Sequence, residues 1–130
     1  MYTKTTHHIN VTAESIFLED QSLPLDHHYV WAYQIWIENQ GPEMVQLLSR
    51  TWWITDGNGV KNEIKGEGVV GEQPWITPGT TYHYTSGTPL HTPSGMMEGV
   101  YHMTTKTGKV FDVAIPAFSL DSPYETAAVH

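Results

Sequence analysis

A glycine-rich stretch at the middle of the chain, residues 66–74 (GEGVVGEQP), carries the motif with the most recognisable chemistry. Gly66, Gly68 and Gly71 have the spacing G-x-G-x-x-G, which binds a dinucleotide pyrophosphate where a strand leads into a helix. Prolines follow at once and block that helix, and residues 81–91 offer no acidic side chain for a ribose. We therefore expect no nucleotide binding, and we interpret the glycines as a structural crossover at which the chain changes sheets.

The eight histidines are the side chains best suited to a transition metal. His83 and His102 are predicted to alternate away from the core on strands that should be near neighbours, so they are candidates for half of a metal site. A tight site needs three or four ligands in fixed geometry, and neither H-x-H nor H-x-x-x-H spacing occurs. We assign no metal site on this basis and expect no cofactor.

No pattern in the sequence indicates catalysis. The chain contains no nucleophile elbow, no Ser-His-Asp set with a local signature and no isolated carboxylate pair. The absence of cysteine removes thiolate nucleophiles and cysteine zinc sites as well. We therefore expect that the protein is not an enzyme.

The single arginine, Arg50, lies in an apolar strand-like segment and must find a hydrogen-bond acceptor there. Glu67 and Glu72 in the glycine stretch are the expected partners, through a charge-assisted hydrogen bond. This pairing would anchor the crossover, and we favour that structural role over ligand binding.

Composition and charge narrow the class of protein. Hydrophobic residues make up 39% and aromatic residues 12% of the 130 positions, which indicates one globular domain over residues 1–130. The net charge of −8 and the scattered lysines argue against nucleic acid as a partner. With no N-terminal apolar segment and no apolar run of about 20 residues, we expect no membrane association and a cytoplasmic location.

Short strands separated by turn sequences dominate the chain, and no helical periodicity persists. Strands are predicted over residues 7–18, 29–38, 44–55, 60–65, around 82–84, 97–104 and 110–115. A β-bulge near Ser49 or Arg50 is needed to keep the third of these in register. The pattern predicts an all-β fold: an antiparallel, immunoglobulin-like β-sandwich of seven or eight strands. The ordered sandwich is expected over about residues 5–120, with the tail 121–130 loosely attached.

The clearest alternation lies in residues 29–38, and it separates a core face from an outer face. The predicted core comprises Trp31, Tyr33, Ile35, Ile37, Tyr84, Tyr101, Phe111, Val113 and Ile115. Trp36 falls on the opposite face, so either another segment covers it or it leaves an exposed aromatic surface. We therefore predict that the protein forms a homodimer through a sheet face or a sheet edge.

Two long loops are the predicted interaction surface, because a rigid sandwich positions its loops for binding. One is the glycine stretch with Glu67, Glu72 and Gln73, and the other is residues 86–95 with Pro89 and His91. We expect Gly66, Gly68 and Gly71 to hold the backbone shape and Arg50 to anchor it. Such an acidic patch suits a basic or amide-rich protein segment.

Several segments of the chain together form a family pattern: QLLSR at 46–50, Trp52 with ITD at 54–56, GEGVVGEQP at 66–74, YTSGTPL at 84–90, MEG at 97–99 and PAF at 116–118. With these segments the chain resembles the ApaG family, and the similarity covers essentially the whole chain. The resemblance implies a fibronectin type III-like sandwich. At the position after Arg50 the family usually has histidine and this chain has Thr51, so no role for a histidine is carried over.

The resemblance, together with the absence of a catalytic pattern, implies two possible functions. The first is a non-catalytic β-sandwich interaction module that binds a protein partner, because related domains occur in F-box and polymerase-interacting proteins with a suspected protein-binding role. The alternative is a divalent-metal-binding protein, since the family is associated with cobalt resistance and magnesium efflux.

Overall fold

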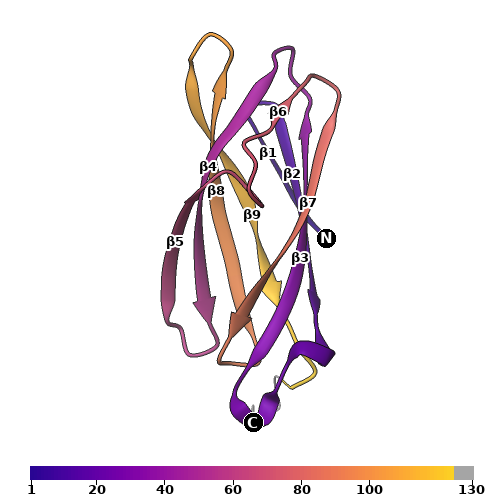
Figure 1. The fold of residues 1–130 in the computed structure, drawn as a ribbon, viewed down its shortest axis with the longest axis vertical. Helices are drawn as coiled ribbons and strands as arrows, with labels where there is room; N and C mark the ends of the chain where they lie inside the picture. The colour runs from indigo at the N-terminus through magenta and orange to yellow at the C-terminus, as the bar shows by residue number, and fades with distance from the viewer. Residues whose placement is uncertain (125–130) are drawn as a thin grey trace.

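Two antiparallel β-sheets packed face to face make up the structure, a computed structural model that describes residues 1–124 (Figure 1). The first sheet has the strand order β1 (Tyr2–Thr6), β2 (Ile9–Phe17), β3 (Tyr29–Asn39) and β7 (Thr81–Leu90). The second has the order β5 (Lys61–Glu67), β4 (Val45–Asp56), β8 (Gly95–Thr105) and β9 (Val110–Leu120), and β6 (Trp75–Ile76) also pairs with β4. Two short 3-10 turns, η1 (Glu19–Gln21) and η2 (Pro24–Asp26), connect β2 to β3. The predicted antiparallel sandwich is confirmed.

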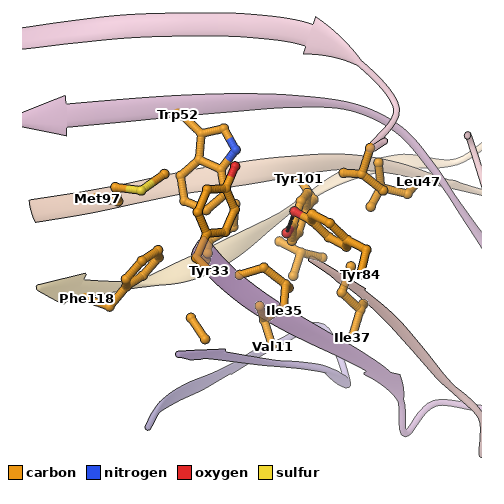
Figure 2. Packing of buried hydrophobic residues seen from close by; sticks show 14 of the residues in the cluster. Val11, Tyr33, Ile35, Ile37, Leu47, Trp52, Tyr84, Met97, Tyr101 and Phe118 are labelled. Atoms are coloured by element: carbon orange, nitrogen blue, oxygen red, sulfur yellow. Dashed lines mark hydrogen bonds between the residues drawn. The ribbon is translucent and has the colours of Figure 1, made fainter. Parts of the chain in front are cut away.

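The core lies between the two sheets and is built from inward-facing residues of both (Figure 2). Along β3 every second residue is buried, from Tyr29 to Asn39, as the alternation predicted. The other predicted core residues are buried too, except Phe111, for which the prediction is wrong. Phe111 is half-buried at the margin of the core, where its ring and that of His7 pack edge to face with their centroids 5.6 Å apart.

The described residues form nine strands where seven or eight were predicted. The segment predicted as one strand over residues 7–18 begins with a tight turn, and a further strand, β1, precedes it. His7 and His8 make that turn with φ of 51° and 68°, values that asparagine or glycine usually adopt. The turn was missed because neither residue is a typical turn former.

Residues 86–95 were predicted as a loop, and this prediction is wrong. β7 continues to Leu90, pairing with β3 as far as Tyr29, so only residues 91–94 connect it to β8. Gly87 and Pro89 are tolerated because β7 is an edge strand. On its outer side no neighbouring strand needs main-chain hydrogen bonds from these residues.

The predicted bulge in β4 occurs one residue earlier than expected. The pairing of β4 with β8 shifts between Leu47 and Ser49, so Leu48 is the extra residue. The shift lets Leu47 and, further along, Trp52 both face the core. It also places Arg50, two residues before Trp52, on the inner face of the second sheet.

The glycine stretch does not carry the chain from one sheet to the other, contrary to the prediction. After it, β6 returns to the same edge of β4 that β5 occupies, pairing Val45 with Ile76. The change of sheet takes place in residues 77–80, between β6 and β7.

Residues 121–124 lie against the sandwich. The indole Nε1 of Trp31 donates to the carbonyl oxygen of Asp121 at 2.8 Å, and Ser122 Oγ donates to the carbonyl oxygen of Pro93 at 2.7 Å. The rest of the predicted tail, residues 125–130, lies outside the described part of the chain. Within residues 1–124 we find no helix with the length and apolar character to cross a membrane.

Candidate functional site

A groove opens between the two sheets along one side of the sandwich. On the other side β1 and β2 pack against β9, whereas β5 and β7 are the free edges of their sheets. The groove between these edges has a volume of about 380 Å³. Its lining includes Tyr33, Arg50, Trp52, Glu67, Val69, Gly71, Tyr84, Ser86, Thr88 and Pro89.

Arg50 crosses the inner face of β5 to reach this groove. It pairs with Gly66, and a Cβ at Gly66 would lie 2.8 Å from Arg50 Nη1, so a side chain there would require the guanidinium to shift. Nη1 donates to the main-chain carbonyl oxygens of Glu67, at 3.0 Å, and Gly68, at 2.6 Å. The predicted anchoring contact therefore exists, but its acceptors are main-chain carbonyls and not the carboxylates of Glu67 or Glu72.

The glycine loop is a tight backbone structure held against β4. Gly68, Val70 and Gly71 have φ of 60°, 42° and 82°. Val69 and Glu72 exchange main-chain hydrogen bonds of 2.8 and 2.9 Å, and the N–H of Gly68 donates to the carbonyl oxygen of Leu48 at 2.9 Å. Val69 is 1% exposed, so the loop is fixed by a buried side chain as well as by its main chain.

Glu72 and Gln73, two of the predicted interaction residues, attach this loop to the strands. The hydroxyl of Tyr82 donates to Glu72 Oε1 at 2.9 Å, which ties the loop to β7. Gln73 Nε2 donates to the carbonyl oxygen of Leu48 at 2.8 Å, which ties it to β4. Both residues are exposed beyond these contacts.

Two tyrosines of the groove lining, Tyr33 on β3 and Tyr84 on β7, converge with the fully buried Tyr101 of β8 beneath the groove. The hydroxyls of Tyr84 and Tyr101 share a hydrogen bond of 2.5 Å, drawn as a dashed line in Figure 2. Burial raises the pKa of Tyr33, Tyr84 and Tyr101, and the charge of Arg50 opposes this more weakly. The three hydroxyls are therefore neutral at physiological pH and place no negative charge beside Arg50.

Trp52 brings a second donor to the same region. Its indole Nε1 is buried, and no hydrogen-bond partner for it occurs within residues 1–124. The ring packs edge-on against Tyr33, with centroids 5.4 Å apart, and Figure 2 shows the indole nitrogen and the tyrosine hydroxyl at the same end of the pair.

The structure gathers four of the predicted site residues at this groove, namely Arg50, Glu67, Gly71 and Pro89. His91 is not among them, because its Nδ1 lies 3.3 Å from the carbonyl oxygen of His27, away from the groove. The groove lining on β7 was missed because residues 86–95 were predicted as a loop. The alternation of Tyr84, Ser86 and Thr88 was the signal for an inward-facing edge strand.

His83 and His102 lie on the outer faces of different sheets, so their predicted approach is wrong. His83 stacks on Trp36 at 4.8 Å and pairs with Gln34 Oε1 at 3.0 Å, which covers one face of the outward-facing indole. No group of three or more histidine, aspartate or glutamate side chains placed to hold a metal ion occurs in the described part of the chain.

His102 belongs to a hydrogen-bonded chain that was not predicted from the sequence. Its Nδ1 lies 2.8 Å from Asp112 Oδ1, and its Nε2 lies 2.9 Å from Thr51 Oγ1. The connectivity matches that of a nucleophile, base and acid triad. However, Thr51 lies in the central strand β4, whose main-chain N–H groups pair with β5 and β8 and offer no oxyanion hole. We interpret these two hydrogen bonds as a polar link across the three strands β4, β8 and β9.

Replacing His102 by alanine should therefore lower stability without removing any function of the groove. Two hydrogen bonds are lost at a half-exposed site, so the free energy of unfolding should fall by about 0.5–1 kcal/mol. Urea unfolding measures this, with His28→Ala as the control, because the His28 side chain makes no hydrogen bond within residues 1–124. An unchanged unfolding midpoint would show that the link across the strands contributes nothing.

Comparison with known proteins identifies the family. The ApaG domain matches residues 19–105. The chain is 58% identical to Protein ApaG of Paramagnetospirillum magneticum over 96% of both chains, and 54% identical to Protein ApaG of Parvibaculum lavamentivorans over 100% of both. A crystal structure of an ApaA protein from Bordetella pertussis is 41% identical, with a TM-score of 0.85 over 95% of this chain and 97% of the other. The chain therefore belongs to the ApaG family.

Proposed function

We propose that the protein is a non-catalytic interaction module whose groove between β5 and β7 binds an extended segment of a partner protein. One observation carries the proposal: both sheets end at this groove with an unpaired edge, and the groove itself is lined by donors and aromatic rings. An extended segment can complete the main-chain hydrogen bonds of such an edge while its side chains enter the groove.

The groove dimensions and rim favour a peptide over a larger surface. A volume of about 380 Å³ accommodates one or two side chains, which is what strand addition delivers. Glu67 and Glu72 are exposed beside the groove, and the protein has a net charge of −8. We therefore propose that the residues flanking the inserted side chain are basic or amide-rich.

The alternative function, divalent-metal binding linked to cobalt or magnesium, receives no support from the histidines singled out in the sequence. His83 and His102 lie on opposite outer faces of the sandwich. A metal site would have to use other ligands.

Selection of peptides from a random display library, followed by titration of one selected peptide, tests the proposal. Glu72→Lys should weaken binding of a basic peptide about tenfold, roughly 1.4 kcal/mol. It removes the hydrogen bond from Tyr82 but keeps the main-chain hydrogen bonds between Val69 and Glu72, so the fold should stay intact. Glu98→Lys makes the same charge change at an exposed position of β8 outside the groove, and it should change affinity less than about twofold.

Amide chemical shifts locate the bound peptide independently of the variants. The largest changes should fall in β5 and β7. Changes confined to the outer faces, or equal losses for Glu72→Lys and Glu98→Lys, would contradict the assignment of the groove.

A further inference from the structure

We infer that the groove recognises a carboxylate, supplied by the segment that the proposed function places there. The inference rests on that function for the source of the carboxylate, and on two unsatisfied donors for its chemistry. They are the guanidinium of Arg50 and the indole N–H of Trp52.

The charge of Arg50 has no counter-ion in the described part of the chain. The ion pairs there join Lys65 to Glu63 and His102 to Asp112. The hydrogen bonds of Arg50 run from Nη1 to two neutral carbonyls, so the charge itself is not neutralised. A half-buried cation without a counter-ion is costly, and an anion in the groove would remove that cost.

Trp52 lies two residues after Arg50 on β4, so both side chains project from the same face. Trp52 is 3% exposed and its Nε1 has no acceptor within residues 1–124. Buried indole N–H groups normally have a partner, and an orphaned one in a groove indicates an acceptor that arrives with the ligand.

The remaining lining is compatible with a carboxylate. The tyrosine hydroxyls are neutral, and Ser86 and Thr88 add hydroxyl donors from β7. Glu67, the carboxylate at the rim, is exposed and makes no ion pair with Arg50 in the described structure. A carboxylate needs only two or three donors and carries one charge, whereas a phosphate would bring more charge to an acidic protein with a single arginine.

Small probes test this without knowledge of the partner. N-acetylglycine represents a chain-terminal carboxylate, N-acetylglutamate α-amide a side-chain carboxylate, and N-acetylglycinamide the uncharged control. In a nitrogen–proton correlation spectrum, at least one acid should shift the indole N–H resonance of Trp52 saturably, and the amide should not. The acid that binds more tightly identifies the source of the carboxylate.

Variants connect the shift to the groove. Arg50→Met should weaken the binding of the acid at least tenfold, and Trp52→Phe three- to tenfold, followed by amide shifts in β7. Lys106→Met removes one positive charge from an exposed turn and should leave binding unchanged. Equal effects of acid and amide, or binding that survives Arg50→Met, would overturn the inference.

The experiments distinguish failure of the carboxylate inference from failure of the proposed peptide binding. Selected peptides that bind the groove equally well after every carboxylate, chain-terminal and side-chain, is replaced by its amide would support the protein-binding module and refute the carboxylate. Saturable binding of an acid at Trp52, when no peptide is selected, would support the carboxylate site and refute the peptide segment.

Discussion

Replacing Gly68 by valine is expected to lower the free energy of unfolding by about 4 kcal/mol or more. A Cβ at Gly68 would overlap the carbonyl oxygen of Glu72 and lie 2.9 Å from its carbonyl carbon. These are main-chain atoms of the same tight loop, so no side-chain rotation can relieve the contact. The φ of 60° adds a second cost, because β-branched residues avoid this conformation.

Gly71→Ala is the matched control, since Gly71 also has positive φ, 82°, but a Cβ added there would meet no atom within 4 Å. Only the conformational cost applies there, about 1 kcal/mol. Urea unfolding of both variants compares the two effects directly. Equal destabilisation would mean that the loop rearranges freely and that the close approach of Gly68 to Glu72 is not a constraint.

The close approach of Gly68 to Glu72 also means that Gly68→Val cannot be used to test binding by the groove. The loop carries Val69, a buried residue that lines the groove, so distortion of the loop deforms the groove. Lost binding in this variant would follow from lost structure. Glu72→Lys changes the charge beside the groove and keeps the main-chain hydrogen bonds of the loop. Arg50→Met also removes two hydrogen bonds to the loop main chain, so its amide spectrum is compared with that of the wild type before its binding is interpreted.

The strand pattern and much of the core could be predicted because alternation and turn chemistry are local. β3 is buried at every second residue, and the hairpin at residues 56–59 closes where its turn sequence predicted, with Asp56 Oδ1 accepting from the N–H groups of Asn58 and Val60. The glycines were predicted to make a crossover between the sheets, whereas the loop that they form follows one edge of β4.

The groove could not be predicted because its parts are distant in sequence and their roles depend on pairing. Arg50 binds main-chain carbonyls, and a sequence shows only side-chain candidates such as Glu67. Trp52 resembles any core tryptophan until its unpartnered nitrogen is located. The chain from Thr51 through His102 to Asp112 likewise requires three strands in register.

Stability is expected to fall steeply as pH rises above 10, by about 3 kcal/mol between about pH 9 and about pH 11 from Tyr84 and Tyr101 together. Burial raises the pKa of both hydroxyls above the ordinary value of 10.0. The unfolded chain therefore loses these protons first, and it binds fewer protons than the folded chain in this range. Their stabilising contribution is complete below pH 10 and is lost as pH rises toward the folded values.

Urea unfolding at about pH 9 and about pH 11 measures this loss, and Tyr84→Phe combined with Tyr101→Phe should remove most of it. Both residues are changed together because either single variant would leave the other hydroxyl buried without its partner. Tyr2→Phe, at an exposed tyrosine, controls for the removal of a tyrosine hydroxyl as such and should retain the full loss. The same pH dependence in the double variant and in Tyr2→Phe would show that the buried pair does not govern alkaline unfolding.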